Sequence, residues 1–147
     1  MSTHTAPLAR ATPWHLWLVA AIAVLWNGYG GYDYTMSQLQ GAAYYRQVGM
    51  TETQIAFMAA YPVWMSAVWA IGVWSGVAGS VLLLLRSRRA LWAFVLSLAA
   101  FLASVGYAFT ATGGAEVMNP AMSLVIAGAG AFFIWYAWAM SRAGVLR

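Results

Sequence analysis

The sequence predicts an all-α fold, an integral membrane bundle of four transmembrane helices with a short interfacial helical segment between the first two. Three observations lead to this prediction. Hydrophobic residues make up 63% of the chain and charged residues only 7%, whereas a soluble domain carries about 25% charged residues. Four long apolar stretches each have roughly the 20 residues that a membrane helix needs. The charged residues, finally, are sorted between the connections.

The arginines and the acidic residues lie in different connections. Six of the seven arginines precede the first apolar stretch, follow the last, or lie between the second and the third. All three acidic residues lie in the other two connections. Short segments that carry arginine resist translocation across the membrane. We therefore expect one membrane domain, residues 1–147, in a bacterial inner membrane with both termini in the cytoplasm.

The first span is expected at about residues 13–34. Thr12 and Pro13 have the residue types of a helix N-cap and a first helical turn. The apolar run ends in a more polar stretch, where tyrosines are suited to the depth of the lipid head groups, and we expect the helix to end near Asp33. The bulky residues Trp17 and Trp26 argue against a cleaved signal peptide. We expect this run to remain as an anchor.

A polar, partly helical segment is expected at about residues 37–60. Its glutamines and Arg46 make it too polar to span the bilayer, which favours a periplasmic interfacial position with a helix end at Gly49. Thr51 and Gln54 have the spacing of a capping box that opens a new helix. A re-entrant segment is the alternative. Pro62 is expected to kink the new helix where it enters the bilayer.

Three further spans are expected at about residues 61–85, 90–111 and 119–141. The arginines between positions 86 and 89 end the first of these on the cytoplasmic side. A double glycine, Gly113 and Gly114, marks the next turn beside Glu116. Asn119 followed by Pro120 is expected to cap the last span.

Small residues and tryptophans predict how the helices pack. Gly72, Gly76 and Ser80 repeat at four-residue spacing, an arrangement that lets two helix backbones approach closely in lipid. We expect this face to pack within the molecule, with a dimer face as the alternative. Four tryptophans lie deeper than the interface and are expected to contact lipid or protein, with a ring-lined ligand site as the alternative: Trp26, Trp64, Trp69 and Trp74.

The candidate binding residues gather at the outer end of the first span. Asp33 is the only acid at the edge of a span, and an intramembrane carboxylate is by default a functional hypothesis. It can instead rest at the interface or pair with Arg46. Asn27 is expected to hydrogen-bond a neighbouring helix, with a ligand contact as the alternative. Tyr29 and Tyr32 lie between the two and complete the set.

The sequence offers little material for catalysis. It has no cysteine, and it shows no phosphate-binding loop, no paired catalytic carboxylates and no nucleophile beside a base, so we do not expect an enzyme. His15 has no partner histidine at helical spacing, and we expect neither a metal site nor a cofactor. The lack of lysine and the scattered arginines argue against nucleic-acid binding.

A pattern of aromatic and polar residues runs along the first two spans: Trp14, Trp26, Asn27, Gly28, Asp33, Tyr34, Pro62, Trp64 and the apolar segment before Arg86. With this pattern the chain resembles, over roughly residues 13–100, a group of short four-helix proteobacterial membrane proteins. Members of that group are mostly uncharacterised, and some are labelled as sugar transporters. The resemblance implies a topology more than an activity.

Two functions are compatible with these features. The first is a non-catalytic accessory or structural subunit that packs against other membrane subunits or a second copy, with the lipid bilayer as its surroundings. It explains the scarcity of catalytic groups. The second is a carrier or channel for a small solute such as a sugar, acting as an oligomer. In that case the residues Asn27, Tyr29, Tyr32 and Asp33 would line the path.

Overall fold

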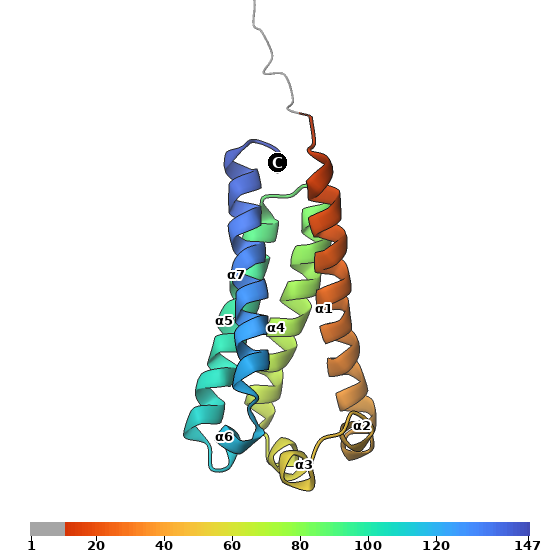
Figure 1. Cartoon of the computed structure of the whole chain (residues 1–147), viewed down its shortest axis with the longest axis vertical. Coiled ribbons are helices and arrows are strands. Elements are labelled where there is room, and N and C mark those ends of the chain that lie inside the picture. The colour runs from red at the N-terminus through yellow and green to blue at the C-terminus, as the bar shows by residue number, and fades with distance from the viewer. Residues whose placement is uncertain (1–10) are drawn as a thin grey trace, which may run out of the picture.

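The computed structural model describes residues 11–147, and every regular element in that range is an α-helix, which confirms the all-helical prediction. Arg10, one of the arginines behind the predicted topology, lies outside the described residues. Four long helices run along the long axis of the molecule (Figure 1): α1 (Trp14–Gln40), α4 (Val63–Leu84), α5 (Arg89–Thr110) and α7 (Pro120–Arg142). Three short helices lie together at one end: α2 (Ala42–Gln47), α3 (Glu52–Ala59) and α6 (Gly114–Val117).

Length and composition make three of the long helices candidates for membrane spans. Among residues 11–147, three helices are long and apolar enough to cross a bilayer: α4, α5 and α7. Helix α1 is longer still, with 27 residues. It falls outside this group because its second half carries Asn27, Asp33 and three tyrosines, which lower its apolar character.

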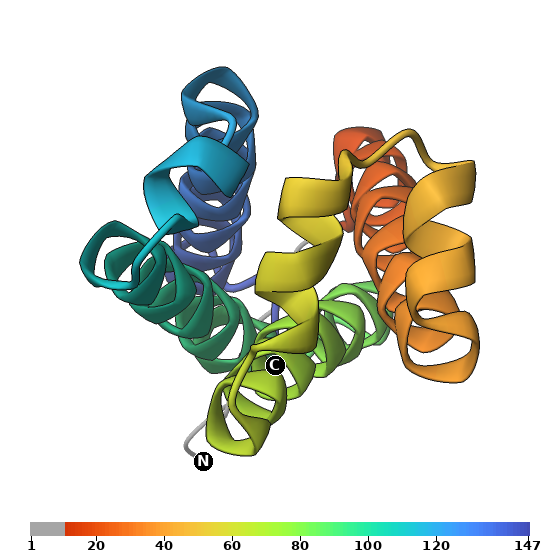
Figure 2. The ribbon, with the colours of Figure 1, turned by 90° about the horizontal axis from the view of Figure 1, so that it is seen from below.

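The four long helices follow one another around an arc. Seen from the end with the short helices, α1, α4, α5 and α7 are neighbours in chain order, and the open side of the arc lies between α7 and α1 (Figure 2). Helices α4 and α5 are the two inner helices of the arc, because α4 packs against α1 and α5, and α5 packs against α4 and α7. Helix α3 lies beneath the open arc. Helices that follow one another in the chain are therefore neighbours in the bundle. Helices α1 and α7, the first and the last, flank its open side.

The small-residue face of α4 makes both of these contacts. A Cβ atom added to Gly72 would lie 3.2 Å from the Cβ of Ala100 on α5. At Gly76 an added Cβ would collide with the side-chain amide of Asn27 on α1. Ser80 is 1% exposed, and its hydroxyl lies within hydrogen-bonding distance of the Ala23 carbonyl of α1. The face thus packs within the molecule, against α1 and α5.

One end of the bundle is tightly packed. Phe94 of α5 stacks on Phe133 of α7 with ring centroids 5.4 Å apart, and His15 of α1 is hydrogen-bonded to the hydroxyl of Tyr136 of α7 at 2.6 Å. Here α1 and α7 meet. The core of this end comprises Leu16, Ala20, Ala23, Leu83, Ala90, Phe94, Phe133, Tyr136, Ala137, Val145 and Leu146.

The same end gathers the arginines, and we name it the arginine end. The backbone N–H of Arg147 donates to the Arg86 carbonyl, and the N–H of Arg88 donates to the Arg147 carbonyl. Arg86 also donates to the hydroxyl of Thr12, just before α1. The start of α1, the α4–α5 connection and the segment after α7 are therefore held together. The opposite end, formed by α2, α3 and α6, is named the short-helix end.

Local signals explain several helix boundaries. Both hydrogen bonds of the predicted capping box are present: Gln54 N–H donates to the Thr51 hydroxyl at 3.3 Å, and Thr51 N–H donates to the Gln54 side-chain oxygen at 2.9 Å. Asn119 caps α7 by accepting from the N–H of Met122, and Pro120 is its first residue. These two predicted helix starts are confirmed.

Two boundary predictions were wrong. Helix α1 does not end near Asp33 but continues to Gln40, where Gly41 adopts φ +53° and ends it. Pro62 separates two helices instead of kinking one, because α3 ends at Ala59 and Pro62 is the N-cap of α4. Proline lacks an N–H and disfavours helical backbone in the preceding residue, which is sufficient to break the helix here.

Candidate binding cleft

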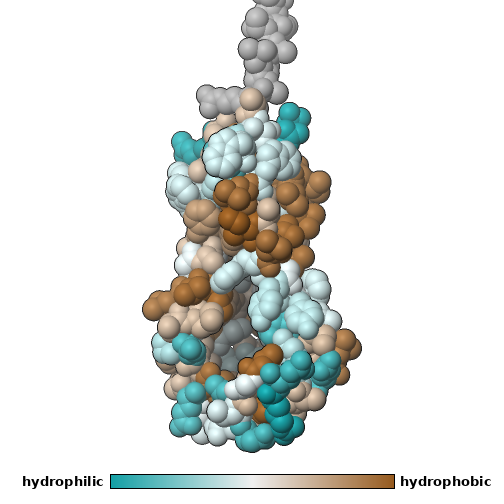
Figure 3. Space-filling view, turned by 45° about the vertical axis from the view of Figure 1, so that its right-hand side comes forward, coloured by the Kyte–Doolittle hydropathy of each residue, from teal (hydrophilic) through white to brown (hydrophobic). Residues whose placement is uncertain are grey.

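A cleft of about 760 Å³ occupies the half of the bundle near the short-helix end. In Figure 3, which faces the side between α1 and α7, it is seen as a hollow below a hydrophobic band and above a hydrophilic rim. Residues from all four long helices and α3 line it: Ile22, Leu25, Trp26, Asn27, Tyr29, Gly30, Asp33, Met58, Tyr61, Val68, Trp69, Gly72, Val73, Ser97, Ala100, Phe101, Ser104, Met122 and Ile126. The cleft opens sideways, on the face between α1 and α7.

The walls of the cleft are mostly apolar and aromatic. Trp26 comes from α1, Trp69 from α4 and Phe101 from α5, and Tyr61 stands in the connection between α3 and α4. Toward the arginine end the cleft stops at the packed core described above. The cleft is therefore closed toward the arginine end and open at the side.

The structure brings together three of the four residues expected to line a path. Asn27, Tyr29 and Asp33 all line the cleft. Tyr29 and Asp33 lie four positions apart on one face of α1, and Asn27 lies two positions before Tyr29. Tyr32 does not line it; its ring packs 6.5 Å from those of Tyr29 and Tyr44.

Arg46 does not pair with Asp33. Its guanidinium donates to both carboxylate oxygens of Glu52, at 2.8 and 3.1 Å, in an exposed ion pair between α2 and α3. These hydrogen bonds hold the pKa of the Glu52 carboxyl below its usual value. Arg46 is therefore a surface residue of the short-helix end, outside the cleft.

Asp33 has a phenol as its partner. The hydroxyl of Tyr44, from α2, donates to Oδ1 of Asp33 at 2.8 Å. This hydrogen bond to the carboxylate is the main cause that raises the pKa of Tyr44 to about 12, with burial contributing as well. Among the described residues that line the cleft, Asp33 is the only charged one. One carboxylate thus sets the electrostatic character of an otherwise apolar recess.

Asn27 serves helix packing at the inner limit of the cleft. Its side-chain amide donates to the Ser80 hydroxyl at 3.0 Å and to the Ala23 carbonyl at 2.9 Å. Nearby, the hydroxyl of Ser97 on α5 donates to the Gly72 carbonyl at 2.7 Å. These hydrogen bonds join α1 to α4 and α4 to α5. The polar groups here are largely engaged with neighbouring helices.

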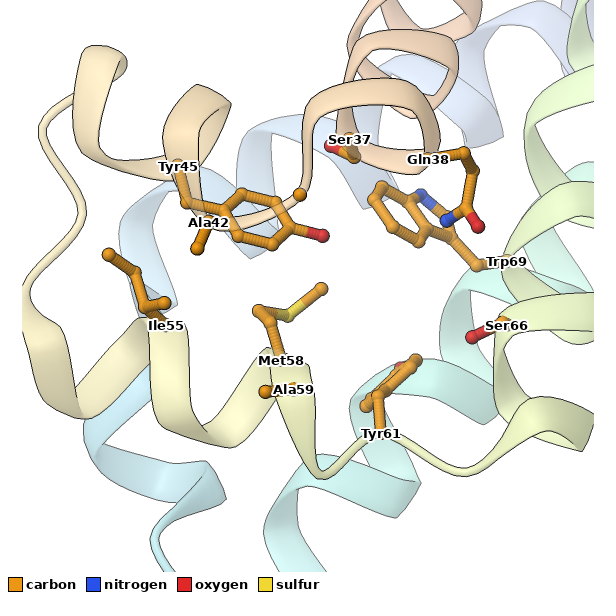
Figure 4. Close-up of a pocket in the computed structure, with 11 residues that line it drawn as sticks. Ser37, Gln38, Ala42, Tyr45, Ile55, Met58, Ala59, Tyr61, Ser66 and Trp69 are labelled. Atoms are coloured by element: carbon orange, nitrogen blue, oxygen red, sulfur yellow. The ribbon is translucent and has the colours of Figure 1, made fainter.

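A second, smaller cavity adjoins the cleft at the short-helix end. Its volume is about 260 Å³, and it shares Met58, Tyr61 and Trp69 with the cleft. Figure 4 shows the ring of Tyr45 pointing toward Trp69 across this cavity, with the Met58 side chain rising between them from α3. Ser37 and Gln38 cover it from α1. The apolar cleft is thus continuous in its lining with a more polar chamber.

The four deeper tryptophans differ in their surroundings. Trp26 and Trp69 line the cleft, whereas Trp64 and Trp74 point outward and are 59% and 49% exposed. Helices α5 and α7 also line the cleft, with residues such as Phe101 and Ile126. The sequence did not indicate that these residues line a cleft. An apolar residue of a membrane helix has the same appearance in sequence whether it faces lipid, another helix or a cleft.

No group of three histidine, cysteine, aspartate or glutamate residues within residues 11–147 is arranged to hold a metal ion. Comparison of the chain with known protein families, curated proteins and solved structures found no match. The geometry of the cleft is therefore the basis for a functional proposal.

Proposed function

We propose that this protein is a non-catalytic accessory subunit of the bacterial inner membrane, which holds an apolar or amphipathic molecule against a larger complex or a second copy. The observation that carries the proposal is the cleft of about 760 Å³ that opens sideways between α1 and α7. Ligand sites in proteins usually have volumes of about 300–1,000 Å³ and mostly apolar walls with a few polar groups. A recess entered from the lipid suits a molecule or segment that already resides in the bilayer.

The proposal includes four spans. Helix α1 packs along α4, and its 27 residues reach about 40 Å at 1.5 Å per residue, more than the roughly 30 Å hydrocarbon core. A cytoplasmic arginine end would put the arginine-rich connection and both chain ends on the side that the positive-inside rule favours. The short-helix end with its acidic residues would then face the periplasm.

The shape of the recess favours a holding role over a transport path. The half of the molecule at the arginine end is filled by the core residues of all four long helices, including Leu16, Leu83, Phe94 and Phe133. A path through the molecule would require this core to separate. A binding role requires no such rearrangement, and the mostly apolar walls suit a lipid-like occupant better than a sugar.

Extraction of the protein from native membranes in a mild detergent tests the proposal. We expect a particle heavier than one 15.9 kDa chain with its detergent, containing a second copy or a partner subunit, together with a bound lipid-like molecule found by mass spectrometry. Gly30→Leu should release the bound molecule, because Gly30 lines the cleft.

Gly28→Leu is the matched control. A Cβ at either glycine meets nothing within 4 Å, so both variants should fold, but Gly28 does not line the cleft. A monomeric particle without a bound molecule, or equal retention of the molecule in both variants, would contradict the proposal.

A small-solute carrier is the second candidate, and one observation favours it. Asn27, Tyr29 and Asp33, which the sequence singled out as path-lining residues, all line the cleft. In this case uptake of the solute by cells should fall sharply in Asp33→Asn while the amount of assembled protein stays unchanged. Unchanged uptake would remove the principal residue of the carrier hypothesis.

A further inference from the structure

We propose that the occupant of the cleft is an amphipathic molecule with an ammonium head group, held between Asp33 and the aromatic walls while its apolar body extends toward the inner part of the cleft. This inference rests on the proposed binding function and names the chemical class of the ligand. Three features of the cleft support it: its charge, its aromatic lining and its shape.

The charge of the cleft selects the sign of the head group. Asp33 is the only charged residue among the described residues of the lining, and its hydrogen bond from Tyr44 is that of a neutral donor. Arg46, the arginine on the same end of the molecule, is paired with Glu52. A cation in the cleft would thus meet an uncompensated carboxylate, whereas an anionic head group would be repelled by it.

The aromatic lining favours an ammonium among cations. Trp26, Tyr29, Tyr61 and Trp69 line the same cleft as Asp33 and come from α1, α4 and the connection before α4. The negative faces of aromatic rings attract ammonium groups, and cages of such rings recognise quaternary ammonium ligands in particular. A carboxylate together with several rings provides both parts of such a site.

The shape of the cleft separates head from body. From Asp33 and Tyr29 toward the arginine end, α1 continues the lining with the aliphatic residues Leu25 and Ile22. Alkyl or aryl groups buried there gain about 25 cal/mol for each Å² removed from water. The opening between α1 and α7 allows the body of the molecule to enter from the bilayer without crossing the polar short-helix end.

Such a head group has two sources. One is a bilayer lipid with an ethanolamine or choline head, of which the cleft would hold the head and part of a chain. The other is a free lipophilic amine dissolved in the membrane. Both present the same chemistry to Asp33, and competition by lipid distinguishes them.

Binding of labelled dodecyltrimethylammonium to the full chain in nanodiscs of an uncharged glycolipid tests the inference, with empty nanodiscs as the blank. We expect saturable binding that is about tenfold weaker in Asp33→Asn, as for the loss of one charge-assisted contact. Asp33→Glu should retain most of the affinity. Glu116→Gln is the matched control, because it removes an exposed carboxylate at the same end outside the cleft.

The arms of the experiment separate the outcomes. Competition by added phosphatidylethanolamine identifies a lipid head group as the source, and its absence identifies a free amine. Equal binding to wild type and Asp33→Asn, or equal binding of an uncharged dodecyl glycoside, overturns the ammonium inference. If Gly30→Leu blocks binding while Asp33→Asn does not, the cleft still binds a ligand and only the ammonium inference fails. If Gly30→Leu leaves binding unchanged, the proposed function fails with it.

Discussion

Asp33 differs from the other two carboxylates of the chain in its surroundings. Glu52 is exposed and paired with Arg46, and Glu116 is exposed on α6. Asp33 alone lines an apolar cleft and accepts a hydrogen bond from a buried tyrosine. Its position at the edge of a span was enough to single it out from sequence. Its partner was not predictable, because Tyr44 reaches it only after Gly41 reverses the chain between α1 and α2.

The hydrogen bond between Tyr44 and Asp33 leads to a prediction about pH. The pKa of Tyr44 is raised to about 12 in the folded protein from 10.0. A phenol with a raised folded pKa stabilises the fold fully below about pH 10, and this contribution is lost as the pH rises toward about 12. Ultraviolet titration of the phenols should show a late-titrating tyrosine that is absent in Tyr44→Phe and titrates earlier in Asp33→Asn. A titration curve that is the same in the wild type and in Asp33→Asn would contradict the hydrogen bond.

Helix α4 illustrates what sequence can predict at the scale of an element. Its small residues at positions 72, 76 and 80 indicated a close approach, and the structure places α5 against Gly72 and α1 against Gly76 and Ser80. The helix caps at Thr51 and Asn119 follow equally from local chemistry. The end of α1 does not, because its polar second half is held in the helix by packing against α4 and α2 as well as by its own sequence.

The close approach of α1 and α4 can be measured by substitution. Gly76→Ala should reduce the free energy of unfolding by about 1–3 kcal/mol, since the added methyl group collides with the Asn27 amide and overpacks the interface. Gly28→Ala on α1 meets nothing within 4 Å and should leave stability unchanged or raise it by up to about 1 kcal/mol through helix propensity. Unfolding in mixed micelles with increasing detergent denaturant provides both values. Equal effects would mean that the two helices do not pack as described.

At the scale of the whole molecule, the sequence predicted the helical class but not the cleft. The prediction of the helical class rests on long apolar stretches and on the positions of the arginines, and so on many residues together. A local error such as the one at Pro62 therefore does not overturn it. The cleft depends instead on how far α1 and α7 separate beyond the His15–Tyr136 contact. That separation is set by the packing of two helices that are distant in sequence. The four-span count and the orientation of the ends stay predictions.

The orientation can be tested without background labelling, because the chain contains no cysteine. Thr53→Cys and Thr112→Cys, both exposed at the short-helix end, should react with a membrane-impermeant maleimide added to intact spheroplasts. Ser87→Cys, in the α4–α5 connection at the arginine end, should react only after the cells are opened. The reverse pattern would invert the proposed orientation, and labelling of all three sites from one side would exclude it.

The sideways opening of the cleft has a consequence for how its occupancy is controlled. A molecule that arrives through the bilayer is first concentrated there, so occupancy follows its mole fraction among the lipids and not its concentration in water. Each additional methylene group favours transfer into lipid by about 0.8 kcal/mol, or roughly fourfold, even where it touches no protein atom. Two compounds with equal contacts in the cleft would therefore rank by their partition coefficients. The site would report on the make-up of the single leaflet that it faces.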